Sequence, residues 1–98
     1  MITKDQILQI LTESRSEWQR QFEVKSLGLF GSAARNELKE TSDIDVLVTF
    51  QNATTFKRYL GLKRYLEHLL KKTVDLITES GLKPRARSYV EKDLIRVA

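Results

Sequence analysis

The chain has 98 residues, 41% hydrophobic and 31% charged, a balance typical of globular proteins and not of disordered ones. That length predicts a single domain over residues 1–98, with one hydrophobic core and no room for a separate substrate-binding lobe. The formal net charge of +4 favours an anionic partner, such as a nucleotide, a nucleic acid or an acidic protein.

The sequence contains no cysteine, which excludes disulfides and thiolate metal sites. The N-terminal residues lack the apolar core of a signal peptide, and no apolar run approaches the ~20 residues of a membrane span. We therefore expect a cytoplasmic protein without a membrane partner.

The first half of the chain predicts two helical segments around one strand. Thr3 and Gln6 form a capping box that starts a helix over residues 4–20. Residues 24–30 are rich in strand-forming residues and end at a glycine, which predicts the first strand. A short helix is expected within residues 32–40.

The second half predicts two further strands, each followed by a helix. Residues 43–50 form a nearly continuous apolar run, as in a strand covered on both faces. A basic amphipathic helix over residues 54–71, a third strand over 73–78 and a final helix over 82–97, with Pro84 in its first turn, complete the chain. The order α-β-α-β-α-β-α predicts an α/β (α+β) fold with a small mixed sheet flanked by helices.

Asp43 and Asp45 lie one residue apart at the start of the second strand. Residues i and i+2 of a strand point to the same face, so the two carboxylates project together. Two carboxylates at this spacing can share Mg²⁺, which favours carboxylate oxygens together with substrate phosphates. A turn cap and a solvated strand end is the commoner explanation of an isolated Asp-x-Asp pair, so other features must decide.

Two other features favour a site. Gly31 lets the backbone approach a ligand closely, and Ser32 offers an amide and a hydroxyl at a helix start, where phosphate binds. Asp75 interrupts the apolar third strand, where a buried, unpaired carboxylate would cost several kcal/mol. A metal would supply the partner that Asp75 needs.

One sheet arrangement brings these residues together. If the first two strands pair antiparallel, Ser32 lies beside Asp43 and Asp45. If the third strand runs parallel to the second, with the helix at 54–71 as the crossover, Asp75 lies at the same edge.

The segments GLFGSAARNELKETSDIDVLVTF and TVDLI resemble the DNA polymerase β-type nucleotidyltransferase superfamily. Gly-Ser, ten residues, Asp-x-Asp and a later strand aspartate are its motif, and nearly the whole chain is similar to the minimal nucleotidyltransferase (MNT) branch. The resemblance implies that Asp43, Asp45 and Asp75 bind two magnesium ions and that Gly31 and Ser32 hold the phosphates of ATP. It also implies in-line attack of an acceptor hydroxyl on the α-phosphorus, with release of pyrophosphate.

Two positions after the Gly-Ser pair bear on this resemblance. Arg35 is similar to a basic residue often found there and is expected to bind the nucleotide. Asn36 stands where MNT domains commonly have glycine, and we expect a stiffer short helix without loss of activity.

MNT domains are typically encoded beside a HEPN-domain ribonuclease toxin, so the resemblance implies an antitoxin that transfers AMP to a tyrosine of a HEPN partner. Two alternatives stay open: a catalytically silent antitoxin that acts by binding alone, and a small RNA-binding protein. The RNA-binding alternative would use the basic helix 57–72 but lacks an evident aromatic platform. The acceptor, the nucleotide preference, homo-oligomer formation and the roles of Arg85 and Arg87 are not determined by the sequence.

Overall fold

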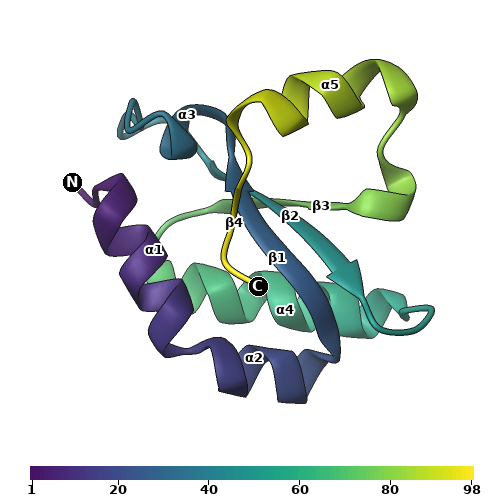
Figure 1. The fold of residues 1–98 in the computed structure, drawn as a ribbon. Coiled ribbons are helices and arrows are strands. Elements are labelled where there is room, and N and C mark those ends of the chain that lie inside the picture. Colours follow the sequence, from purple (N-terminus) through teal and green to yellow (C-terminus); the bar gives the residue numbers. More distant parts are fainter.

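The computed structural model describes all 98 residues, and helices lie on both sides of a four-stranded sheet (Figure 1). On one side lie α1, α2 and α4, and on the other lies α5, while the single turn α3 lies at the end of the sheet, where it follows β1. In chain order, the elements are α1 (Lys4–Glu13), α2 (Arg15–Phe22), β1 (Val24–Phe30), α3 (Gly31–Ala34), β2 (Ile44–Phe50), α4 (Phe56–Leu70), β3 (Val74–Thr78), the 3₁₀ turn η1 (Glu79–Gly81), α5 (Pro84–Asp93) and β4 (Ile95–Arg96).

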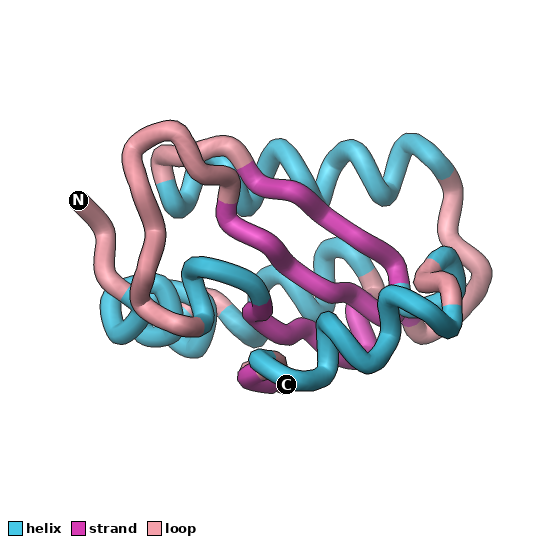
Figure 2. Tube along the Cα trace, turned by 90° about the horizontal axis from the view of Figure 1, so that it is seen from above, coloured by secondary structure: helices cyan, strands magenta, loops and turns pink.

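The strands run side by side in the order β3-β2-β1-β4 (Figure 2). As predicted, β1 and β2 are antiparallel, β2 and β3 are parallel, and α4 is the crossover between the parallel strands. The C-terminal end of β1 therefore lies beside the N-terminal ends of β2 and β3. In the register, Phe30 faces Asp45, and Asp45 faces Asp75.

The predicted first helix is two helices. Its capping box is present, but the continuous helix over residues 4–20 was wrong, because α1 ends before Ser14 and α2 begins after it. The Ser14 hydroxyl donates to the carbonyl of Ile10 at 2.8 Å, a local bond that competes with helix continuation. Beyond the break, the Trp18 indole folds back and donates to the carbonyl of Leu11 at 3.0 Å.

The short helix after β1 is a single turn. Asn36 lies beyond its end with φ 59°, a left-handed conformation that asparagine tolerates better than most residues. Its side-chain oxygen accepts a hydrogen bond from the backbone N–H of Lys4 at 3.0 Å. The expectation that Asn36 stiffens this helix was wrong, and the left-handed backbone explains why glycine also suits the position.

The C-terminal segment also differs from the prediction. The final helix does not continue over residues 82–97, because α5 ends at Asp93 and β4 then pairs with β1. A Cβ atom on Gly28 would lie 2.6 Å from the Leu94 side chain and 3.3 Å from the carbonyl oxygen of Ile95, so glycine lets β4 approach β1 without displacing Leu94. The short β4 covers an edge of the sheet that would otherwise expose unpaired backbone groups.

The hydrophobic core is unequally divided between the two faces of the sheet. The larger cluster joins the sheet to α1, α2 and α4 and to the buried alanines of α3, and it contains 17 buried residues: Ile7, Leu11, Trp18, Phe22, Val24, Leu27, Leu29, Ala33, Ala34, Ile44, Val46, Val48, Leu62, Leu66, Leu70, Val74 and Leu76. On the opposite face, only Phe30, Leu47 and Val90 are buried together. None of the helices combines the length and apolar character needed to cross a membrane.

Candidate active site

The three predicted site aspartates lie at the same edge of the sheet. Asp45 and Asp75 are direct neighbours across the parallel pair β2–β3, and Asp43 precedes Asp45 by two residues, just before β2 begins. Asp45 is half-buried, whereas Asp43 and Asp75 are exposed. The expectation that Asp75 is buried was therefore wrong: it lies on the thinly covered face of β3, at the edge, where solvent reaches it.

The side chains do not yet surround a common point. The Thr73 hydroxyl donates a hydrogen bond to the Asp43 carboxylate, and no three acidic or histidine side chains are arranged to hold a metal ion together. Coordination by all three aspartates therefore requires their side chains to turn towards a common point, and Asp43 still has a carboxylate oxygen that Thr73 does not engage. Thr73 was missed from the sequence, although the predicted parallel pairing of the strands places it near Asp43.

The electrostatics of this edge favour a cation. Burial, followed by the negative charges of Asp75 and Asp43, raises the pKa of Asp45 to about 6. A hydrogen bond with Asp75 adds to this shift, and the positive charge of Arg35 opposes it. Closely spaced carboxylate oxygens with an uncompensated negative charge suit a hard cation such as Mg²⁺, so the donor chemistry fits the metal that the resemblance implies.

Gly31 and Ser32 lie where β1 passes into α3, next to the aspartate edge. Gly31 has φ +69°, and a Cβ atom there would lie 2.2 Å from a carboxylate oxygen of Asp45. Both the backbone conformation and the contact therefore require glycine. Half-buried Ser32 follows at the same turn, so the structure brings the Gly-Ser pair and the acidic pair together.

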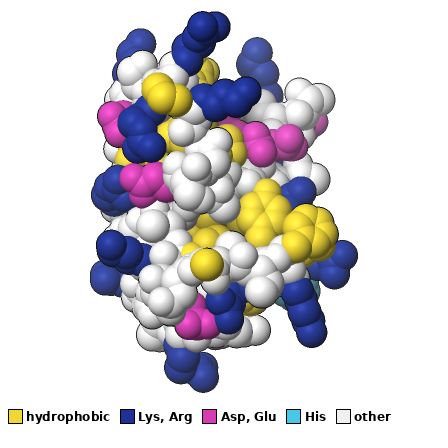
Figure 3. Space-filling model, turned by 90° about the vertical axis from the view of Figure 1, so that its right-hand side faces the viewer, with side chains coloured by type: hydrophobic (Ala, Val, Ile, Leu, Met, Phe, Trp, Pro, Cys, Tyr) yellow, Lys and Arg dark blue, Asp and Glu magenta, His cyan; other side chains and the backbone are white.

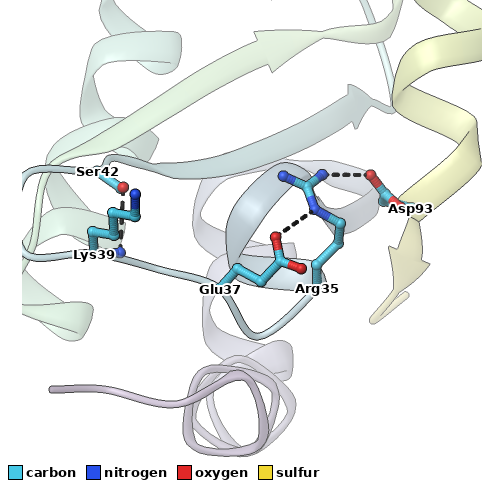
Figure 4. Close-up of polar contacts among 5 residues, drawn as sticks. All are labelled: Arg35, Glu37, Lys39, Ser42 and Asp93. Atoms are coloured by element: carbon cyan, nitrogen blue, oxygen red, sulfur yellow. Dashed lines mark hydrogen bonds and ion pairs between the residues drawn. The ribbon is translucent and has the colours of Figure 1, made fainter.

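Arg35 follows α3 directly, and two carboxylates hold its guanidinium group (Figure 4). Its Nη1 lies 2.7 Å from Asp93 and its Nε 3.2 Å from Glu37. The hydrogen bond with Asp93, and then that with Glu37, raises the pKa of Arg35. Neither acidic partner was predicted, because Asp93 is 58 residues away along the chain and no local pattern links it to Arg35.

No hollow in the surface contains the aspartates or the Gly-Ser turn. A hollow of about 280 Å³ lies instead at the opposite end of β2 and β3, lined by Val48, Thr49, Phe50, Asn52, Ala53, Thr54, Thr78 and Ser80. The aspartate edge is open, so this chain leaves much of any nucleotide bound there uncovered.

The basic helix is only partly neutralised. Within residues 57–72, Arg58 pairs with Glu23 at 2.5 Å, and the Lys72 ammonium donates to the carbonyl of Glu40 at 2.8 Å. Of the six Lys and Arg residues in this segment, only Arg58 forms an ion pair. The others leave a positively charged surface that suits an acidic partner.

An exposed phenylalanine that stacks on a half-buried tyrosine corrects one argument against RNA binding. Phe56 is 74% exposed, and its ring stacks on that of Tyr59 with centroids 6.4 Å apart. Figure 3 shows a hydrophobic patch with Lys and Arg around it on the face at the right of Figure 1, where β2 connects to α4. The predicted lack of an exposed aromatic platform was wrong, although this patch lies away from the aspartates.

The two arginines of α5 differ in their surroundings. Arg85 is exposed. Arg87 lies 3.5 Å from Glu79 and 3.9 Å from Glu91, so its charge is largely compensated within the chain.

Comparison with known proteins identifies the family of the chain. Residues 8–97 match the family described as "Nucleotidyltransferase domain". The chain belongs to this family. It is therefore a nucleotidyltransferase.

The chain is also similar to one curated protein and to two solved structures. The chain is 38% identical over 97 residues to protein adenylyltransferase MntA of Thermococcus cleftensis, covering 99% of this chain and 98% of that protein. A solved structure of a candidate minimal nucleotidyltransferase has a TM-score of 0.81 at 34% identity, covering 96% of this chain and 95% of that one. The MNT antitoxin in a complex with the tri-AMPylated HEPN toxin of Shewanella oneidensis shares the fold, with a TM-score of 0.68 at 18% identity, covering 93% of this chain and 71% of that one.

Proposed function

We propose that the protein is an antitoxin that transfers AMP from ATP to a tyrosine hydroxyl of a HEPN-domain ribonuclease partner. The observation that carries the proposal is the row formed by the Gly31–Ser32 turn, Asp45 and Asp75 across three strands, in a family of nucleotidyltransferases. The names of the adenylyltransferase MntA and of the AMPylated toxin complex support AMP as the transferred group and a toxin as the acceptor.

Each site residue has a role in this chemistry. Gly31 and Ser32 hold the triphosphate of ATP against the end of β1. Asp43, Asp45 and Asp75 hold magnesium, which when bound neutralises charge on the attacking and leaving oxygens. Asp75, exposed at the edge, takes the proton of the acceptor hydroxyl as the tyrosine oxygen bonds to the α-phosphorus. The bond from that phosphorus to the bridging oxygen breaks, and pyrophosphate leaves.

The open edge is consistent with an acceptor that arrives on another protein. No surface hollow surrounds the aspartates, so a tyrosine on a partner can reach them without displacing any part of this chain. The partner would then cover the nucleotide and exclude water from the reaction.

Transfer of a labelled phosphate tests the proposal. The protein is incubated with Mg²⁺ and the HEPN protein encoded beside it, using ATP labelled at either the α- or the γ-phosphate, and the label is located by mass spectrometry. We expect transfer of the α label to a partner tyrosine, no transfer of the γ label, and one pyrophosphate released per transfer. Transfer of the γ label, or no transfer at all, would contradict the proposal.

Neutralisation by binding alone is a distinct alternative, in which the protein occludes its partner without transferring AMP. Toxin activity in the presence of the Asp75→Asn variant separates the two functions. If this variant binds the partner and still suppresses its ribonuclease activity without transferring AMP, occlusion is sufficient and the catalytic account of neutralisation fails.

A further inference from the structure

The guanidinium group of Arg35 joins two distant parts of the chain. It forms a 2.7 Å ion pair with Asp93 at the end of α5 and a 3.2 Å ion pair with Glu37, two residues further along (Figure 4). Glu37 is only two residues from Arg35 along the chain, so it stays within reach of the guanidinium whatever the position of the loop after α3. The distant partner, Asp93, is brought to Arg35 only by the packing of α5 against the sheet.

The two ion pairs are unequal. The side chain of Asp93 is 16% exposed and that of Glu37 is 64% exposed, so solvent screens the contact with Glu37 far more. A short, charge-assisted hydrogen bond in a less exposed position is the stronger of the two. Asp93 is therefore the group that fixes the guanidinium.

Asp93 is itself held in place from both sides along the chain. Three residues before it, Val90 is buried against Phe30 and Leu47 of the sheet. One residue after it, Leu94 packs against Gly28, and β4 then pairs with β1. The position of the Asp93 carboxylate is thus set by the sheet that also carries the aspartate edge.

Arg35 lies close to that edge. Its backbone N–H donates to the carbonyl of Gly31 at 3.2 Å, and its charge acts on Asp45, where it opposes the rise in pKa. Glu37 and Asp93 engage Nε and Nη1, which leaves Nη2 and a second N–H of Nη1 free to donate. These donors suit phosphate oxygens.

We infer that Asp93 is a positioning residue, which holds the Arg35 guanidinium beside the Gly31–Ser32 turn so that its free N–H groups contact the triphosphate of the bound nucleotide. The inference rests on the proposed function, because it requires a nucleotide at this turn. It gives α5 a part in the site without placing any residue of α5 in contact with the substrate.

The direction of the effect distinguishes positioning from simple electrostatics. Asp93 is negative, so by charge alone its removal near a triphosphate should tighten binding. If Asp93 acts by positioning Arg35, its removal should weaken binding. Glu37→Gln is the matched control, because it removes the same charge from the same guanidinium but leaves Asp93 in place.

Calorimetry with magnesium and ATP is the test, with a thermal melt to establish that each variant is folded. We expect Asp93→Asn to weaken Mg-ATP binding roughly five- to tenfold, as for loss of a charge-assisted hydrogen bond, and Asp93→Glu to restore most of it. Glu37→Gln should change the affinity by less than about twofold. Unchanged or tighter binding by a folded Asp93→Asn protein would overturn the inference.

A double-mutant cycle keeps the inference testable if Asp93→Asn is poorly folded. We expect Arg35→Gln, which removes the guanidinium that Asp93 positions, to weaken Mg-ATP binding at least about fivefold. Any loss of affinity that Asp93→Glu causes in the wild type should disappear in the Arg35→Gln background. An effect of Asp93→Glu that persists without Arg35 would show that the carboxylate acts by another route and would overturn the inference. If the wild-type protein binds no Mg-ATP, the proposed function fails too, whereas failure of the variants alone removes only the role of Asp93.

Discussion

The two faces of the sheet differ in what they bury, although the same strands supply both. Along β2, Ile44, Val46 and Val48 enter the cluster of 17 buried residues under α1, α2 and α4. The alternate residues Asp45 and Leu47 face the other way, where only three residues are buried together. One face can therefore provide most of the stability, while the other carries a charged site.

The difference has an electrostatic reason. No polar or charged residue is buried, so the thick face of the sheet, covered by α1, α2 and α4, contains no buried charge that needs a partner. On the thin face, meaning the face of the sheet covered by α5, incomplete cover leaves Asp45 half-buried and Asp75 exposed, so that neither carboxylate bears the full cost of burial. A thicker layer on this face would force these carboxylates to become neutral or paired.

The largest expected effect comes from removing charge on the thin face. The double variant Asp43→Asn with Asp45→Asn should lower AMP transfer at least about a hundredfold, since even the outer-shell partners of a metal ligand are worth 10–100-fold. Its folded state should be no less stable without metal, because two repelling charges are removed. Transfer of the α label and thermal melting measure the two quantities. If the variant is unfolded, these aspartates are needed for folding, and the conclusion that stability and the charged site belong to different faces is wrong.

Truncation of one leucine on each face should give the next largest effect. Leu66 is fully buried in the large cluster, and Leu66→Ala should lower the free energy of unfolding by about 3–5 kcal/mol. Leu47 is 4% exposed in the small cluster, and Leu47→Ala should cost about 2–3 kcal/mol, because fewer neighbours lose contact. Urea unfolding of both variants gives the comparison. Equal losses would mean that the thin face contributes as much as the thick one.

The sequence predicted the middle of the fold better than its ends. The apolar runs of the three longer strands, the crossover helix and the strand directions were correct, because alternation and loop length leave few other arrangements. The break at Ser14 and the strand β4 were missed. The break depends on short-range side-chain contacts, namely the bond from Ser14 to Ile10 and the fold-back of Trp18 onto Leu11, whereas β4 depends on the approach of Leu94 to the distant Gly28.

The candidate site follows the same rule. The spacing along the chain was enough to name Gly31, Ser32, Asp43 and Asp45, and Asp75 was found as a charge within an apolar strand. The strand directions then place all five at one edge of the sheet. The exposure of Asp75 was not predicted, because it depends on how little of the second face α5 covers. The partner Asp93 was missed because its hydrogen bond with Arg35 spans the fold, whereas Thr73 was missed although the predicted strand pairing places it near Asp43.

The smallest expected effect is a dependence of stability on pH that arises from the thin face alone. In the folded protein, the pKa of Asp45 is about 6, above its ordinary value of 3.8, so ionised Asp45 destabilises the fold. This cost is present above pH 6 and disappears as the pH falls towards 4. In metal-free buffer, Asp45→Asn should therefore exceed the wild type in free energy of unfolding at pH 7, and this advantage should shrink at pH 4.5. The shift of about two pKa units corresponds to a larger free energy at a fully buried group, but solvent screens this half-exposed carboxyl, so we expect a difference in free energy of unfolding of about 1 kcal/mol.

The difference between the two proteins isolates Asp45 from other titrating groups. The hydrogen bond from Thr49 lowers the pKa of Glu79, so the stabilisation that Glu79 contributes is lost on acidification. This loss is the same in both proteins and cancels in their difference. Adding Mg²⁺ at pH 7 should stabilise the wild type and reduce the advantage of the variant, because the cation supplies the compensation that the carboxylates lack. An advantage that is the same at both pH values would show that Asp45 is not strained by burial and charge. The thin face would then be no more electrostatically stressed than the thick one.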